Sequence, residues 1–401
     1  MEEKDAVIVG ARCAGSTLAI ALAERGWDVL VVDRDRFPSE TVSTHFVYPN
    51  TVARFDQLGV LDRLRARHKV PFLANRIVGL GHEIAGTFTS IDGFERCIGP
   101  RRSALDQAII EAALAAGAEG RFGERVVDLI GGGTEEDPVS GVVLEGGDRV
   151  KARWVFGADG RASTVAGKLG LQKERPQQGE IAFLFGYWSG IPDNGHMTLA
   201  AREDALGNRW AIEDGLTMLI AGGDAELTKG TTEERHRKYI QAIRRVPELT
   251  EPDMLDRAEL VTDVTVAPET LMRGFFRRPT GPGWALLGDA CHFKHPATAQ
   301  GINDAVEQAI YVAEQLSGAD GSLAEYESWR DARAAEHYDW SFAWGHFPKP
   351  ETAGPLFRGW ASEPDAGQDL RDTFSRRLEP SQLMTPERMS RWFAGAPAPT
   401  G

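Results

Sequence analysis

Three segments of the chain combine glycine with aspartate or other polar residues, and each directly follows a short apolar run. They are GARCAG at 10–15, GADGRAST at 157–164 and GDACHFKHPATAQGIN at 288–303. Open α/β sheets bind ligands at the carboxyl ends of their strands. A single Asp-Gly turn is usually a plain loop, but three such segments in this order predict one shared ligand site.

The first segment has nearly the spacing of a dinucleotide-binding turn. Gly10 is placed to make the tight turn, and Gly15 to let a helix and a strand pack closely. Arg12 stands where a glycine usually lets the backbone approach a pyrophosphate, so we expect Arg12 either to reach the pyrophosphate or to turn to solvent. Asp33 follows Gly10 by 23 residues, where an acid that binds a ribose belongs.

A strand–turn–helix–strand unit must hold this first turn. The apolar run at 5–10, the helical pattern after Ser16 that Gly26 closes, and the apolar run at 27–33 have the size of one βαβ unit with parallel strands. Residues 284–290 again form an apolar run with a glycine turn, which is typical of a buried strand, and the pattern at 297–318 predicts a long helix. We therefore expect the nucleotide-binding domain to be discontinuous in the sequence.

Residues 180–278 read differently, as successive strands of an antiparallel sheet. The fold class that follows is α/β: a Rossmann-like binding domain, an inserted and mostly antiparallel sheet domain, and a helical C-terminal extension. Within that extension, the segment 346–380 is rich in proline, glycine and charge, and is expected to be a surface excursion. The expected boundaries are 1–75, 99–178 and 279–320 for the binding domain, 76–98 and 179–278 for the sheet domain, and 321–401 for the C-terminal region.

The ordered trio of segments resembles the FAD-dependent monooxygenases with the p-hydroxybenzoate hydroxylase fold, the group A flavoprotein monooxygenases. The resemblance covers about residues 5–320, and RRSALD at 101–106 is similar to the family segment whose arginine contacts FAD. GARCAGS and HPATAQGI, together with FPSETVSTH, look like one sub-branch whose reactions vary. The resemblance implies a fold that places FAD between the binding domain and a substrate domain.

The resemblance implies that the residues contacting FAD come from all parts of the discontinuous domain. Asp289 is placed to bond ribityl hydroxyls, and the helix that begins near Gly301 is expected to aim its N–H groups at the flavin pyrimidine edge. The full predicted set is Gly10, Arg12, Cys13, Ala14, Gly15, Asp33, Arg34, Arg102, Val126, Asp159, Gly288, Asp289, Pro296, Ala299, Gly301, Ile302 and Asn303.

The sequence departs from the wider family at three of these motifs. Arg12 and Ala299 replace common glycines, and Ala166 replaces a basic residue, which leaves the contact with NAD(P)H open. Cys13 and Cys291 fall on turns expected to face FAD and are read as small packing residues that lie near one another.

Three histidines are the candidate catalytic residues. His45 follows Ser43 and Thr44 after the second strand, and it is expected to orient substrate, shuttle protons or carry a covalent flavin link; a hydrogen-bonded loop histidine is the alternative. His292 and His295, with Lys294 between them, flank the expected ring position. One of these three is an acid/base candidate at the flavin edge, and a surface loop is the alternative.

Tryptophans Trp340 and Trp344 are four residues apart and share one helical face. Aromatic residues at such spacing are usually core residues, although an aromatic-lined pocket would suit a hydrophobic or aromatic substrate.

The overall composition narrows the partners. The net charge of −14 disfavours binding to nucleic acid or to an anionic membrane. There is no apolar run of transmembrane length and no signal-like N-terminus, and the three cysteines are too far apart to form a metal-like pair. We expect a cytoplasmic protein that acts on a small molecule without a metal; the oligomeric state is left open.

The resemblance implies an enzyme that uses NAD(P)H, O₂ and FAD to hydroxylate or epoxidise a hydrophobic, aromatic or polyketide-like molecule through a C4a-(hydro)peroxyflavin. The alternative is a reductase or dehydrogenase on the same fold, although the Gly/Cys-rich segment usual after its second strand is absent. A halogenase is less favoured, because the halogenase tryptophan motif and lysine are missing. A non-catalytic FAD-binding protein is the remaining alternative.

Overall fold

The first sheet forms the frame of the binding domain. In the computed structural model, which describes residues 2–251 and 253–394, its central strands run in the order β18, β8, β1, β2 and β5, and all neighbouring pairs in this run are parallel. These strands are β1 (Glu2–Val9), β2 (Val29–Asp33), β5 (Glu119–Phe122), β8 (Arg149–Gly157) and β18 (Trp284–Leu286); β17 (Thr280–Gly281), β6 (Val126–Ile130) and β7 (Gly141–Leu144) add antiparallel pairs. Segments far apart in the sequence thus end at one edge of this sheet.

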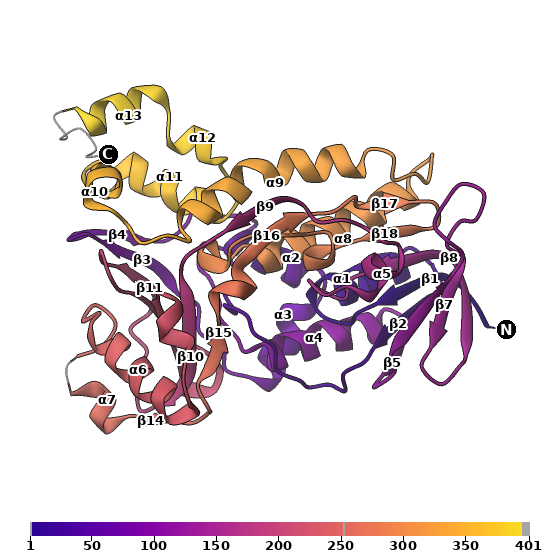
Figure 1. Cartoon of the computed structure of the whole chain (residues 1–401), viewed down its shortest axis with the longest axis horizontal. Helices are drawn as coiled ribbons and strands as arrows, with labels where there is room; N and C mark the ends of the chain where they lie inside the picture. The colour runs from indigo at the N-terminus through magenta and orange to yellow at the C-terminus, as the bar shows by residue number, and fades with distance from the viewer. Residues whose placement is uncertain (1, 252, 395–401) are drawn as a thin grey trace.

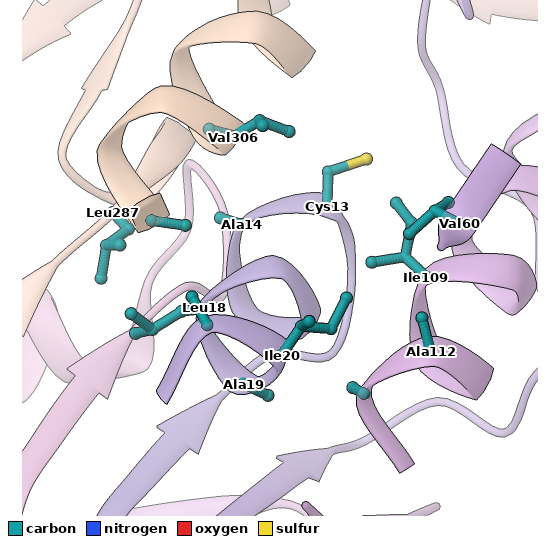
Figure 2. Close-up of a cluster of buried hydrophobic side chains, with 14 of the residues drawn as sticks. Cys13, Ala14, Leu18, Ala19, Ile20, Val60, Ile109, Ala112, Leu287 and Val306 are labelled. Carbon is teal, nitrogen blue, oxygen red and sulfur yellow. The ribbon is translucent and has the colours of Figure 1, made fainter. Parts of the chain in front are cut away.

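Alternate residues of β1 and β2 serve two different cores because successive strand side chains point to opposite faces. Ala6 and Ile8 pack with helices α1 (Cys13–Ala23), α4 (Arg102–Ala115) and α8 (Gly301–Ser317), whereas Val7 and Val9 pack with β7 and α5 (Thr164–Lys168). Figure 2 shows α1, which carries Leu18 and Ile20, lying between the helix that carries Val306 and the one that carries Ile109. Helices α2 (Pro49–Gln57) and α3 (Val60–Arg67) complete this core.

The second sheet is mostly antiparallel, as its sequence pattern predicts. Its strands run β14 (Glu259–Leu260), β10 (Ala182–Ser189), β13 (Thr217–Gly223), β12 (Leu206–Ala211), β11 (His196–Ala201), β3 (Ala74–Gly79) and β4 (His82–Gly86), with β15 (Thr265–Ala267) on β10; the pair β3 and β11 is parallel. One face packs on α6 (Thr232–Arg244) and α7 (Met254–Arg257). A small third sheet contains β9 (Glu174–Gln178), β16 (Arg273–Phe276) and β19 (His292–Phe293).

The other face of the second sheet is covered by the C-terminal helices, as Figure 1 shows. These are α9 (Tyr326–Ala343), α10 (Pro350–Ser362), α11 (Pro364–Phe374), α12 (Pro380–Leu383) and α13 (Pro386–Phe393). The expectation of a surface excursion at 346–380 is therefore wrong, since Phe357, Trp360 and Phe374 are buried core residues. Two of its prolines start helices: Pro350 and Pro364 stand in the first turns of α10 and α11, where no backbone donor is needed, whereas Pro355 lies inside α10.

The predicted fold class is confirmed: a discontinuous binding domain, an inserted sheet and helices at the C-terminal end. Residues 395–401 of the expected C-terminal region lie outside the described chain. None of the described helices combines the length and apolar character that a membrane-spanning helix requires.

Candidate functional site

A large cavity of about 960 Å³ lies where the three predicted segments meet. Its size is at the upper end of small-molecule sites, which run to about 1,000 Å³. Seventeen of the predicted residues line it: Gly10, Arg12, Cys13, Ala14, Asp33, Arg34, Arg102, Val126, Asp159, Gly288, Asp289, His292, His295, Pro296, Ala299, Gly301 and Ile302. Gly15, His45 and Asn303 lie outside its lining.

The first glycine-rich turn is packed too tightly for side chains. Gly10 has a φ of +104°, and a Cβ there would stand 2.4 Å from the carbonyl oxygen of Ala158, which belongs to the second segment. A Cβ on Gly15 would stand 1.8 Å from the carbonyl oxygen of Gly10. Gly15 therefore allows α1 to approach the turn, although it does not touch the cavity.

Asp33 holds this turn from the end of β2. Its Oδ2 accepts the N–H of Ala11 at 2.7 Å and its Oδ1 accepts the N–H of Asp35 at 2.8 Å. Burial raises the pKa of Asp33. Each carboxylate oxygen keeps a lone pair for a ligand hydroxyl, so this residue can both fix the loop and bind a ribose.

Arg12 is neither free to reach toward a pyrophosphate nor turned to solvent, the two outcomes expected from the sequence. Its guanidinium donates to Asp106 Oδ2 at 2.7 Å and to Asp35 Oδ2 at 3.1 Å, so it is held along the cavity wall by carboxylates. Arg102 donates to Asp106 Oδ1 at 2.8 Å. A single buried carboxylate thus fixes two cavity arginines, and the extended backbone at Arg12 (φ −88°) tolerates a side chain where the dinucleotide-binding pattern expects glycine.

The cysteine on this turn is a packing residue. Cys13 Sγ lies 3.4 Å from Asp106 Oδ1, and burial raises its pKa to about 12, so it is a thiol at neutral pH. Cys291 packs in a different core, against Arg330.

The second and third segments each contribute a partly buried carboxylate. Asp159 Oδ2 accepts the N–H of Thr164 at 2.6 Å, while Asp159 Oδ1 has no hydrogen-bond partner within residues 2–251 and 253–394. Burial raises the pKa of Asp159, and it raises that of Asp289 to about 6. An unpaired buried acceptor on the cavity wall favours a ligand that brings hydroxyl groups.

Two of the candidate histidines are buried on the cavity wall, so the surface-loop alternative does not hold for them. His295 Nδ1 accepts the N–H of Ala297 at 3.2 Å, and burial lowers its pKa to about 3. The neutral ring therefore carries its proton on Nε2, which has no acceptor among the described residues. His292 Nδ1 accepts from Gln308 at 3.1 Å, and its Nε2 lies 3.3 Å from Asp304.

His45 stands one position beyond the cavity-lining run 41–44 and turns toward the second sheet. Its Nε2 shares a hydrogen bond with the hydroxyl of Tyr187 on β10, and its backbone is left-handed, with a φ of +59°. Asn303 faces α2, where its Oδ1 accepts from Asn50 and from Thr51. These two residues join elements around the cavity.

A second, smaller pocket of about 160 Å³ lies between the second sheet and the C-terminal helices. It is lined chiefly by aromatic and aliphatic residues: Phe183, Leu199, Ala201, Leu206, Asn208, Ala297, Trp340, Ala343, Trp344, His346, Pro348, Ala353, Leu356, Phe357, Trp360 and Met384. Ala297 lines this pocket while its neighbours His295 and Pro296 line the cavity, so the two spaces share the turn at Pro296–Thr298 as a wall. Trp340 and Trp344 are thus both core and pocket residues.

Two polar atoms in the small pocket are unpaired within the described part of the chain. They are Asn208 Oδ1, an acceptor, and Trp360 Nε1, a donor. An apolar pocket with one donor and one acceptor suits a flat hydrophobic molecule that carries a few oxygen atoms.

Sequence reasoning missed two residues at the cavity. Asp304 lines the cavity and Asp106 holds two of its arginines, and neither was proposed as a site residue although both stand inside the quoted motifs or next to them. Lys294, one of the three acid/base candidates, also lines the cavity. Asp106 shows its role only in three dimensions, because its partner Arg12 is 94 positions away. The run Thr41–Thr44 also lines the cavity.

The residues present fit FAD. The side-chain-free cradle at Gly10, the N-terminus of α1 and the acid at Asp33 suit an adenosine diphosphate, since phosphates bind at helix N-termini. The cavity continues to a second helix N-terminus at Gly301 and to the acceptors of Asp159 and Asp289, as a longer, hydroxylated ligand requires. When bound, FAD supplies electron transfer and oxygen chemistry that side chains lack.

Comparison with known proteins agrees with this fit. The family described as FAD binding domain matches residues 3–341. The menaquinone reductase of Mycolicibacterium smegmatis is 28% identical, over 84% of this chain and 82% of that protein, and the 6-methylpretetramide 4-monooxygenase of Streptomyces rimosus is 29% identical, over 76% and 73%. A flavoprotein/dehydrogenase structure from Cytophaga hutchinsonii superposes with a TM-score of 0.79 at 17% identity, covering 95% of both chains. The chain therefore belongs to the FAD binding domain family and is an FAD-dependent oxidoreductase.

Proposed function

We propose that the protein is an FAD-dependent monooxygenase that uses NAD(P)H and O₂ to oxygenate a flat, hydrophobic small molecule. The observation that carries this proposal is the shared wall at Pro296–Thr298, with the polar cavity on one side and the aromatic pocket on the other. A cofactor and an apolar substrate would then meet at this turn. Named relatives that oxygenate, such as the Streptomyces enzyme, support the same reaction type.

In this proposal the two ends of the cavity hold different parts of FAD. Gly10, Asp33 and the start of α1 bind the adenosine diphosphate half, while Asp289 and the start of α8 bind the ribityl chain and the ring. His295 holds the shared turn through the N–H of Ala297, and Trp340, Trp344 and Trp360 exclude water around the substrate.

A reductase is the second candidate, and a specific observation favours it. The relatives named menaquinone reductase match more of this chain than the named monooxygenases do, at 80–84% of its length. A quinone is also flat, apolar and oxygen-bearing, so the aromatic pocket suits it equally well.

Isotope labelling separates the two candidates. The FAD-loaded protein is incubated with NADPH or NADH, ¹⁸O₂ and a panel of phenols, naphthoquinones and polycyclic aromatics, and the products are analysed by mass spectrometry. The monooxygenase proposal expects ligand-stimulated NAD(P)H oxidation and one ¹⁸O atom in the product. Reduction of a quinone under strict anaerobiosis, with no ¹⁸O product from any panel member in air, would replace it with the reductase. Protein that purifies with FAD but shows neither activity would point to a non-catalytic role.

A further inference from the structure

A buried charged cluster reaches the wall of the cavity, and the proposed function above assigns it no role. We call Lys294, Asp304, Gln300 and Arg376 the lysine cluster. Lys294 Nζ lies 2.7 Å from Asp304 Oδ2 and donates to Gln300 Oε1 at 3.2 Å. Arg376 Nη1 lies 3.8 Å from Asp304 Oδ1. The side chains of Lys294, Asp304 and Arg376 are only 3%, 6% and 2% exposed.

The cluster carries an excess positive charge. Two cations, Lys294 and Arg376, face the single carboxylate of Asp304, and burial lowers the pKa of the neighbouring His292 so that its ring is neutral. Arg376 Nε and Nη1 have no hydrogen-bond partner in the described chain. The next shell, Glu307, Arg333 and Glu379, is partly exposed, so water screens its charges.

The excess charge lies at one defined end of the cavity. Lys294 and Asp304 both line it, next to Pro296 and to the start of α8 at Gly301. The N-terminus of a helix adds partial positive charge at the same place. Asp289, the other carboxylate that lines this end, is near both Arg102 and Arg161, which favour its charged form.

The C-terminal helices hold this charge in position. The Gln300 amide donates to the carbonyls of Thr373 and Phe374 at the end of α11, at 3.2 Å and 3.0 Å. Arg376, left-handed with a φ of +63°, donates to the carbonyl of Arg333 on α9. A buried ion pair of this kind often stabilises a fold no better than apolar residues do. The cluster therefore calls for another role, and an anion in the cavity would supply the missing partner.

Reduced flavin is such an anion. The oxidised ring is neutral, and when it gains two electrons and one proton, as NAD(P)H delivers them, it carries one negative charge. We propose that Lys294, fixed by Asp304 and Gln300, is a positioning residue whose charge stabilises the reduced flavin at this end of the cavity. The proposal rests on the placement of FAD given above, but not on oxygen insertion.

The equilibrium between FAD and a reference dye tests this role. Holoprotein and a redox dye of known potential are reduced together without oxygen at pH 7, and the reduced fractions are read from their spectra. Burial lowers the pKa of Lys294 to about 8, so its ammonium form dominates at this pH. Removing one unit of positive charge from the interior is expected to lower the equilibrium constant for FAD reduction by about tenfold or more.

Lys294→Met and Lys294→Gln are therefore expected to lower this constant about tenfold, while Lys294→Arg, which keeps the charge, stays within about threefold of wild type. Arg125→Met is the matched control, since Arg125 lines the cavity beside Val126 at the Asp33 end; there the constant is expected to stay within about twofold.

Two results would overturn the proposal. One is FAD-loaded Met and Gln variants that keep the wild-type constant. The other is an Arg variant shifted as far as the Met variant, which would assign the effect to packing. If Lys294→Met does not retain FAD, the Gln and Arg variants decide between these readings. A wild-type protein that takes up no FAD would instead contradict the proposed function itself.

Discussion

The cavity and the aromatic pocket share one turn but are built by different means. Backbone turns after β1, β8 and β18 shape the cavity, with glycines where no side chain fits. Side chains from β10, β11, β12, α9 and α10 shape the pocket. A backbone-built site tolerates little change in sequence, whereas a side-chain-built site can change its ligand by substitution. The comparison teaches that cofactor and substrate recognition are separable in this fold.

The largest effect is expected from a substitution in the cavity, the site that is shaped by backbone turns. Gly15→Val places a Cβ 1.8 Å from the Gly10 carbonyl oxygen, and backbone cannot move aside without breaking the turn. We expect a loss of more than about 3 kcal/mol of unfolding free energy and no retained FAD, measured by denaturant unfolding and visible absorbance. Gly167→Ala on α5, where a Cβ meets nothing within 4 Å, is the control and should unfold as wild type does. A folded, yellow Gly15→Val protein would refute the packing argument.

The dependence of stability on pH tests the border between the cavity and the aromatic pocket, where His45, His295 and His337 are buried. Burial lowers the pKa of each to about 3, below an unfolded value near 6.5. Below pH 6.5 these histidines become protonated in the unfolded chain but stay neutral in the folded chain. The free energy of unfolding is therefore highest above pH 6.5 and falls as the pH decreases. Each of these histidines is expected to lower the free energy of unfolding by about 2 kcal/mol between pH 7 and pH 5. Chemical denaturation across this range should show that the free energy of unfolding falls as the pH is lowered, and His295→Phe should make this dependence on pH less steep. An unchanged dependence in the variant would contradict the buried neutral ring of His295.

A smaller effect is expected from the polar atoms of the aromatic pocket. Trp360→Phe removes the unpaired Nε1 donor but keeps an aromatic ring, and Asn208→Leu removes the unpaired acceptor. Each should weaken binding of menadione, a naphthoquinone probe, by about five- to tenfold, since one hydrogen bond contributes about 1 kcal/mol. The measurement is titration of the flavin absorbance change. Leu356→Met, a volume-conserving change in the same pocket, should leave affinity within about twofold. Altered FAD content in either polar variant would break the separation of the two sites.

The smallest effect is expected at Arg12. Arg12→Gln removes one of two arginines on Asp106, but Arg102 still pairs with that carboxylate. We expect about 1 kcal/mol of lost stability and an FAD affinity within about threefold of wild type, measured by thermal unfolding and by fluorescence titration of FAD. A hundredfold loss of FAD affinity would show that Arg12 binds the pyrophosphate after all.

The same contrast explains what the sequence could predict. Gly10, Asp33 and Asp289 were predictable because turns after buried strands leave a local pattern of glycine, acid and apolar run. The pairs Arg12–Asp106 and Asp304–Arg376 were not, because their members lie 94 and 72 positions apart in the sequence. The helices α10 and α11 were mistaken for a surface excursion because their prolines suggested helix breaks, although Pro350 and Pro364 occupy first turns and Pro355 is accommodated inside α10. Trp344 and Trp360 became pocket residues only when α9 and α10 met.

The cover that α10 and α11 place on the second sheet has a consequence during protein synthesis. The last strand of that sheet ends at Ala267, but Leu370 and Phe374 leave the ribosome about 100 residues later. Translation proceeds at about 5–20 residues per second, so the apolar face that bears Phe185 and Trp210 stays uncovered for roughly 5–20 seconds until these helices are synthesised. A nascent chain of this protein is thus most exposed to aggregation and to chaperones late in translation, and shortening its gene at the 3′ end would make that exposure permanent.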